Sequence, residues 1–197
     1  MTSQTIARLS VTLQDVEPKV TRRLEVPADI RLDRLHLVLQ AAMGWTNSHL
    51  YEIRAGDVGW GIPDPDWPDG PLNAKKATLW DVVADTGVKT LHYTYDFGDN
   101  WEHVVRIERF TDPDPAASYP VLIAASGRCP PEDVGGFPGY EEFLAAIADP
   151  DHERHEEISE WWPEDFDPTT APVDDLKSGV AALARQWNRK PRARKSA

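Results

Sequence analysis

The stretch LHYTYDFGDNWEHVVRIE, residues 91–108, decides the fold, because apolar and polar residues alternate on both sides of a turn. This pattern predicts a β-hairpin. A two-residue loop at residues 98–99 would mix apolar and charged side chains on both faces of the hairpin. A three-residue loop at residues 98–100 leaves one continuous apolar face, and burial of such a face fixes the register. We therefore expect the three-residue loop, which pairs Tyr95 with His103 on the core face.

The rest of the chain supplies strands and helices that can pack against this hairpin. Alternating or apolar segments predict strands at residues 7–13, 20–26 and 119–125. Helical spacing predicts helices at residues 32–43, 78–84, 140–147 and 172–187, and a further helix that begins at Asp149 and Pro150. Residues 55–77 are rich in glycine and proline and predict a long surface loop. We predict an α+β fold: a mostly antiparallel sheet with packed helices and a helical C-terminal region.

Charge divides the chain into an acidic body and a basic end. The 197 residues carry a formal net charge of −12, and residues 130–167 contain thirteen acidic residues against one basic residue, Arg154. Residues 189–195, RKPRARK, carry five positive charges and no acid. We expect one domain over residues 1–188, followed by a disordered basic tail at 189–197. An acidic surface repels phosphate backbones, so nucleic acid is expected as a partner only through this tail.

The sequence also indicates the cellular location of the protein. Neither an apolar run of transmembrane length nor a secretory signal is visible, and the single cysteine, Cys129, cannot form an internal disulfide. These features predict a cytoplasmic protein that does not bind a membrane.

The hairpin turn concentrates acidic residues. The expected register sets Asp96 opposite Glu102 on the face away from the core, with Asp99 in the turn. Two facing carboxylates can raise a pKa for acid–base chemistry or bind a cation, and they can also be solvated charges near a turn.

The segment CPPEDVGG, residues 129–136, predicts a rigid loop. Two prolines fix its backbone, and two glycines permit positive φ angles. The loop presents the thiol of Cys129 and the carboxylates of Glu132 and Asp133, and the acidic neighbours disfavour a thiolate. We expect this loop to pack beside the hairpin turn. The gathered carboxylates would then be offset by backbone N–H groups, by Arg22 or Arg128, or by a bound cation.

A third segment, DPDHERHEE at residues 149–157, suggests a metal site. Its spacing would place His152, His155 and Glu156 on one helical turn, an arrangement that metal sites on helices use. Exposed histidines of an acidic helix are the alternative interpretation. The nucleotide, dinucleotide and α/β-hydrolase motifs GxGxxG, Walker A and GxSxG are absent from the sequence, as is CxxC.

These segments, together with LHLVLQAAMGWTNSHLYEI at residues 35–53, resemble the Ri-plasmid open-reading-frame-three family. The family includes the TnpR passenger protein of an insertion sequence. The resemblance spans roughly residues 5–185 and implies a cytoplasmic protein with a mixed α and β fold and a link to mobile elements. It supplies no catalytic residue, and no recombinase site is visible in the chain.

We therefore expect a non-catalytic binding or accessory protein that recognises a protein or a small-molecule ligand and needs no cofactor. The candidate binding residues lie in three of the resembling segments: Trp45, His49, Asp96, Asp99, Glu102, Cys129, Glu132 and Asp133. The alternative is a metal-dependent enzyme, such as a hydrolase, which uses a divalent metal held by these acids and histidines.

Overall fold

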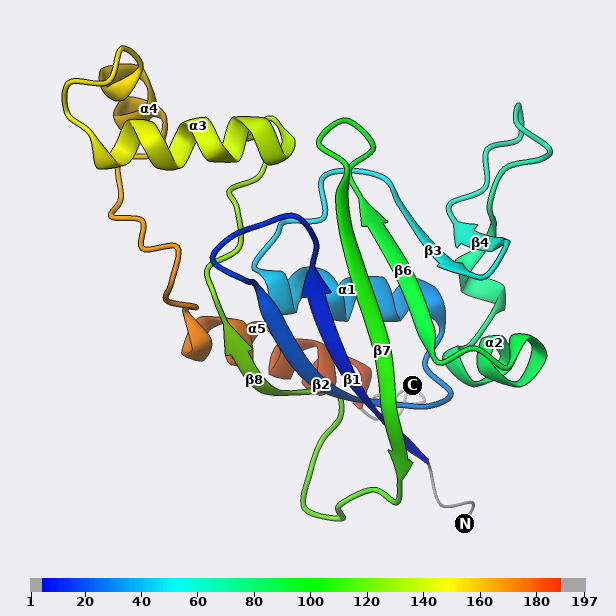
Figure 1. The fold of residues 1–197 in the computed structure, drawn as a ribbon. Coiled ribbons are helices and arrows are strands. Elements are labelled where there is room, and N and C mark those ends of the chain that lie inside the picture. The colour runs from blue at the N-terminus through cyan, green and yellow to red at the C-terminus, as the bar shows by residue number, and fades with distance from the viewer. Residues whose placement is uncertain (1–4, 189–197) are drawn as a thin grey trace, which may run out of the picture.

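Eight strands form one sheet in the computed structural model, which describes residues 5–188 (Figure 1). The strands are β1 (Ile6–Leu13), β2 (Thr21–Pro27), β3 (Tyr51–Ala55), β4 (Val58–Gly61), β5 (Leu72–Asn73), β6 (Thr90–Tyr95), β7 (Trp101–Thr111) and β8 (Val121–Ser126). The helices are α1 (Leu32–Met43), α2 (Leu79–Thr86), α3 (Gly136–Ala148), α4 (His155–Trp161) and α5 (Val173–Trp187), with the short 3₁₀ turn η1 (Ala74–Lys76). The strand order is β5-β4-β3-β6-β7-β1-β2-β8, and every pair except β4–β5 is antiparallel. The predicted α+β fold is confirmed.

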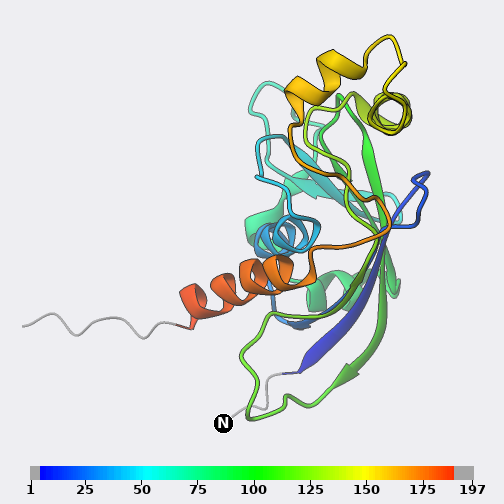
Figure 2. The ribbon, with the colours of Figure 1, turned by 90° about the vertical axis from the view of Figure 1, so that its left-hand side faces the viewer.

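The sheet is covered on one face. Helices α1 and α5 pack there, while no helix of the described residues covers the middle of the opposite face (Figure 2). Alternate residues of β1 point toward the helices and are buried, whereas their neighbours are half-buried. Helices α3 and α4 lie beyond one end of the strands, at the end where the β6–β7 turn also lies (Figure 1).

Helix α1 has the predicted bounds because its apolar stripe faces the sheet. Leu32, Leu35 and Leu39 are completely buried, which stabilises the fold by about 1.5–3 kcal/mol for each side chain. Gly44 ends the helix at φ 90°, a left-handed conformation that glycine adopts at low cost. The chain therefore turns sharply after residue 44 and enters the segment that carries His49.

Arg22 is a buried cation that bonds only to backbone carbonyls. Its Nε donates to the carbonyl of Ala42 in the last turn of α1, at 2.6 Å. Its Nη1 donates to the carbonyls of Thr21, Ser126 and Gly127 at 2.8–3.1 Å. A guanidinium at the negative end of a helix is favourable, and burial lowers its pKa. Arg22 thus fastens α1 to β2 and β8.

The predicted hairpin register is wrong by two residues. Tyr95 pairs with Trp101 and Tyr93 pairs with His103, so the connection runs over residues 96–100. Asp96 takes a left-handed conformation, with φ 58°, and leaves the strand before pairing can continue. A shift of two residues keeps the same side chains on the core face, so His103 is buried as expected. Asp96 does not lie opposite Glu102, because Thr94 does.

Two further sequence expectations are corrected. Residues 55–77 are not one loop, since β4, β5 and η1 lie within them; Trp60 is buried in β4 and Trp67 is exposed. The helix expected to begin at Asp149 begins at His155 instead. The carboxylate of Asp149 accepts the N–H of Asp151, and this contact belongs to a turn rather than to a helix cap.

Two expectations concern features outside the sheet. The predicted basic tail at residues 189–197 lies outside the described part of the chain. Among the described residues, every helix is too short or too polar to cross a lipid bilayer.

Candidate metal site at the end of the sheet

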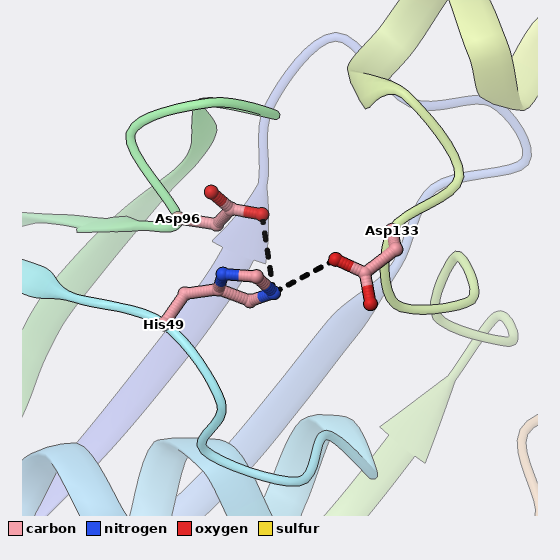
Figure 3. Close-up of side chains that lie close together, drawn as sticks. All are labelled: His49, Asp96 and Asp133. Carbon is pink, nitrogen blue, oxygen red and sulfur yellow. Dashed lines mark ion pairs between the residues drawn. The ribbon is translucent and has the colours of Figure 1, made fainter.

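Three segments that are distant in the sequence bring His49, Asp96 and Asp133 together (Figure 3). His49 lies in residues 44–50, between α1 and β3. Asp96 follows β6 directly, and Asp133 lies in residues 127–135, between β8 and α3. The three side chains point toward one another, and their nearest ligand atoms all lie within 4.8 Å of one another (Figure 3).

The segment that carries His49 is fixed by hydrogen bonds to α1 and β6. Asn47 has φ 60°, and its N–H donates to the side chain of Gln40 at 3.0 Å. The Nε2 of His36 bonds to the side-chain oxygen of Asn47, and its Nδ1 bonds to the hydroxyl of Tyr93 at 2.9 Å. Burial lowers the pKa of His36 to about 4, so its ring is neutral at pH 7. These contacts fix the loop before it reaches His49.

The β6–β7 turn holds Asp96 in a single orientation. The N–H of Asp96 donates to the carbonyl of Leu50 at 2.9 Å, which fastens this turn to the His49 segment. The Oδ1 of Asp96 accepts the N–H of Gly98 at 2.9 Å, so Oδ2 remains free to face His49. Aspartate tolerates the left-handed conformation better than most residues, which explains an Asp at this position.

The loop at residues 129–136 packs beside the hairpin turn, as predicted. The N–H of Gly135 donates to the carboxylate of Asp99 at 3.2 Å. A Cβ atom on Gly136, which has φ 66°, would lie 2.6 Å from the carbonyl oxygen of Asp99. Such a close approach is open only to glycine. Asp133, with φ 58°, is held directly across from His49 by this contact between loop and turn.

The Nε2 atom of His49 is the centre of the cluster. It lies 2.9 Å from Oδ1 of Asp133, 3.6 Å from Oδ2 of Asp96 and 3.7 Å from Oε2 of Glu132. It is also buried and makes no hydrogen bond to any described residue, since its contact with Asp133 lacks hydrogen-bond geometry. The contacts with Asp96 and Asp133 are ion pairs when the ring is protonated (Figure 3). A buried nitrogen without a hydrogen bond is costly, so its position among three carboxylates requires an explanation.

A divalent cation fits these distances. Two ligand atoms about 2.1 Å from one ion lie about 3.0 Å apart at an octahedral angle and about 3.4 Å apart at a tetrahedral angle. The separations of Nε2 from Asp133 and Asp96 are 2.9 and 3.6 Å, close to these values. One imidazole nitrogen with carboxylate oxygens is a donor set for Mn²⁺, Fe²⁺ or Zn²⁺.

The charges at the cluster are not balanced by arginine. Among the described residues, no lysine or arginine forms an ion pair with Asp96, Glu132 or Asp133. Of the three expected ways to offset these carboxylates, the arginine alternative is therefore wrong, whereas backbone N–H groups do contribute: Gly98 donates to Asp96 and Thr46 donates to Glu132. Arg22 bonds to backbone carbonyls, and Arg128 donates to the carbonyl of Asp165. Three carboxylates around one imidazole leave an excess of negative charge that a cation would reduce.

The remaining candidates of these segments have different surroundings. Glu132 accepts the N–H of Thr46 at 2.6 Å, and the indole of Trp45 donates to the carbonyl of Pro130 at 3.0 Å. Asp99 and Glu102 line a separate hollow of about 570 Å³, together with Phe137 and Pro138 of α3. Cys129 is buried, and burial raises the pKa of its thiol to about 12, so the thiol is protonated at pH 7.

The candidates His152, His155 and Glu156 are not gathered into a group of metal-ligand geometry among the described residues. His152 precedes α4, so the helical spacing on which the prediction rested does not exist. The Nδ1 of His152 accepts the N–H of Arg154 at 3.1 Å, and the Nδ1 of His155 bonds to the carbonyl of Ala146 at 2.6 Å. Both rings thus hold the connection between α3 and α4.

The fold and the cluster define an α+β protein with a His–Asp–Asp site at one end of an eight-stranded sheet. The chain belongs to the plasmid pRiA4b ORF-3-like protein family, whose profile matches residues 5–175. This confirms the resemblance seen in the sequence.

The chain is also similar to two further proteins. The uncharacterized protein y4hQ of Sinorhizobium fredii (strain NBRC 101917 / NGR234) is 55% identical over 188 residues, which cover 95% of this chain and 96% of that protein. The crystal structure of MM3350 from Methanosarcina mazei Go1, a protein of unknown function, superposes with a TM-score of 0.77 at 33% identity. That match covers 88% of this chain and 98% of the archaeal chain.

Proposed function

We propose that the protein binds a divalent transition-metal ion through His49, Asp96 and Asp133. The observation that carries the proposal is the buried Nε2 of His49, which has no hydrogen bond and is faced by carboxylate oxygens. A metal ion would give this nitrogen a partner and would reduce the repulsion between the carboxylates. The donor set favours Mn²⁺, Fe²⁺ or Zn²⁺ over the harder Mg²⁺ and Ca²⁺.

The protein would use this metal to bind a ligand, which would reach the metal from the solvent-exposed side of the cluster. The side chain of Asp133 is 69% exposed and that of His49 is 30% exposed, so one side of the cluster is open. Three protein ligands leave further coordination positions for a donor atom of a small molecule or of a partner protein. This retains the binding role expected from the sequence, with the metal as its centre.

Metal-dependent hydrolysis is the second candidate, and the position of Glu132 favours it. The Oε2 of Glu132 lies 3.7 Å from Nε2 of His49, but Glu132 is outside the group whose ligand atoms all lie within 4.8 Å of one another. A carboxylate beside that group would accept a proton from water bound to the metal, and a metal lowers the pKa of such water. Hydrolysis of an activated ester by the metal-loaded protein, abolished by chelator, would support this candidate. Full metal occupancy without turnover would support the binding role.

Other parts of the proposal rest on sequence and family. An accessory role for a mobile element is supported by the plasmid name of the family. A cytoplasmic location is supported by the free thiol of Cys129. Contact with nucleic acid through residues 189–197 would appear as salt-dependent retention on DNA that is lost when these residues are removed.

Metal titration after chelator treatment tests the proposal. At a hundredfold excess over Kd, bound metal stabilises the folded state by about 2.7 kcal/mol, which raises Tm by about 5–10 °C for a domain of this size. The Asp96→Asn variant keeps the shape of the side chain and tolerates the left-handed conformation, but it removes the charge. We expect the Tm increase in the wild type and its loss in Asp96→Asn. If Mn²⁺, Fe²⁺ and Zn²⁺ all leave the Tm of the wild type unchanged, the proposal is refuted.

A further inference from the structure

The hydroxyl of Tyr95 bonds to two of the three segments that carry the proposed metal ligands, and Tyr95 itself lies in the third. It accepts the backbone N–H of Ser48 at 2.9 Å and that of His49 at 3.3 Å. It donates to the carboxylate of Glu132, whose oxygens lie 3.1 and 3.2 Å away. Tyr95 also immediately precedes Asp96 in the chain, and Glu132 immediately precedes Asp133.

These contacts use the full capacity of the hydroxyl. A tyrosine O–H offers one donor and two acceptor positions, and all three are occupied here. Burial raises the pKa of Tyr95 to about 12, so the hydroxyl keeps its proton and remains a donor at neutral pH. The arrangement therefore does not change across the physiological range.

The ring of Tyr95 is as firmly held as its hydroxyl. Only 1% of the residue is exposed, and its ring stacks on that of Trp45 with centroids 5.0 Å apart. The indole of Trp45 in turn donates to Pro130, at the start of the loop that carries Glu132. A rigid side chain thus joins the His49 segment to the Asp133 loop at two points.

Glu132 completes the connection. Its Oε1 accepts the N–H of Thr46 at 2.6 Å, and its Oε2 remains on the side that faces His49. Without the hydroxyl of Tyr95, the loops at residues 44–50 and 129–135 would lose the hydrogen bonds that meet at a single atom between them. The distance between Nε2 of His49 and Oδ1 of Asp133 depends on how these two loops are placed.

We propose that Tyr95 is the positioning residue of the metal centre: its hydroxyl sets the backbone of His49 against the loop of Asp133. This inference rests on the proposed metal site and adds to it a residue that touches no metal. Outer partners of metal ligands typically change metal affinity by 10–100-fold when they are removed.

The experiment compares Tyr95→Phe with Tyr140→Phe, using Co²⁺ as the probe. Both tyrosines are 1% exposed, but the hydroxyl of Tyr140 makes no hydrogen bond to a described residue. Each substitution therefore removes one buried hydroxyl, and only the first breaks the connection between the loops. We measure Co²⁺ affinity by calorimetry, the visible absorption spectrum at saturating Co²⁺, and Tm without metal.

We expect Tyr95→Phe to bind Co²⁺ 10–100-fold more weakly and with an altered spectrum, while Tyr140→Phe matches the wild type. A role in stability alone would lower Tm and leave the spectrum of the folded, saturated protein unchanged. Equal affinity and spectrum in Tyr95→Phe and wild type would overturn the inference and leave the metal site standing. A wild type that binds no Co²⁺, Mn²⁺ or Zn²⁺ would overturn both.

A second variant covers the case in which Tyr95→Phe does not fold. Glu132→Gln keeps the size of the side chain and weakens the charge-assisted bond from the hydroxyl of Tyr95. We expect an altered spectrum at saturating Co²⁺ in this variant, because the lost charge of Glu132 alone would weaken affinity without moving His49 relative to Asp133. A wild-type spectrum in Glu132→Gln would overturn the inference.

Discussion

Oδ1 of Asp133 lies 2.9 Å from Nε2 of His49, although four strands separate β3 from β8 in the sheet. The two residues meet because the loops before β3 and after β8 both lie at the end of the sheet where β6 turns into β7 (Figure 3). The turn supplies Asp96, and Tyr95 bonds to both loops. The candidate site is therefore a product of the topology.

Asp133→Asn is expected to weaken metal binding at least tenfold with little effect on stability. Its side chain is 69% exposed, so loss of the charge changes the free energy of unfolding by about 0.5 kcal/mol at most. Calorimetric titration with Mn²⁺ or Zn²⁺ measures the first effect and urea unfolding the second. Glu160→Gln, which removes a charge from the exposed face of α4, is the control and should keep wild-type affinity. Equal affinity in both variants would remove Asp133 from the site.

Gly136→Ala is expected to damage the site through the backbone. The new Cβ would lie 2.6 Å from the carbonyl oxygen of Asp99, so α3 and the hairpin turn must move apart. Gly56→Ala is the matched control, because Gly56 also has a positive φ but nothing lies within 4 Å of a Cβ there. Both variants should lose about 1 kcal/mol to backbone strain. Only Gly136→Ala should also lose metal affinity; a similar loss in Gly56→Ala would contradict the account.

Arg22→Met is expected to destabilise the fold by at least about 4 kcal/mol. It leaves four buried or half-buried carbonyls without their donor, and each unsatisfied group costs about 1–3 kcal/mol. Arg23→Met is the control on the same strand, because Arg23 is exposed and its ion pair with Glu108 contributes about 1 kcal/mol or less. Urea unfolding measures both variants. Equal losses would show that Arg22 does not fasten α1 to the sheet.

Stability should fall as the pH drops from about 6.5 to about 4. Burial lowers the pKa of both His36 and His103 to about 4, whereas the unfolded chain binds these protons near pH 6.5. The unfolded state thus carries more protons in this window, and each histidine removes about 3 kcal/mol of stability by pH 4. Urea unfolding at several pH values, in the presence of chelator, measures the slope of the free energy of unfolding against pH. His103→Gln should reduce this slope by the equivalent of about one proton taken up on unfolding. His92→Gln, at an exposed position, should leave the slope unchanged. An unchanged slope in His103→Gln would show that His103 does not cause the loss of stability at low pH.

Local patterns predicted the elements that depend on local physics. The apolar spacing of residues 32–43 predicted the bounds of helix α1, and the helix predicted at residues 78–84 is α2, which begins after a capping box formed by Thr78 and Asp81. The register of the hairpin could not be predicted, because the left-handed conformation of Asp96 depends on its contact with Leu50 in another segment.

The members of the candidate site were predicted in part. Asp96, Asp133 and His49 were among the candidates, and the loop at 129–136 was expected beside the hairpin turn. The sequence did not indicate that these three residues form one cluster, since that depends on loops joined by long-range hydrogen bonds. Tyr95 was treated as a core residue, because an apolar strand face gives no sign of what its hydroxyl contacts.

The most direct test is a crystal structure of the protein with bound Mn²⁺ or Zn²⁺, with anomalous scattering recorded at the metal edge. The account predicts one anomalous peak about 2.0–2.3 Å from Nε2 of His49 and from carboxylate oxygens of Asp96 and Asp133. Tyr95 should keep its hydrogen bonds to His49 and Glu132 in that structure. A fully occupied peak elsewhere, or none at saturating metal with the three side chains still clustered, would contradict the central claim.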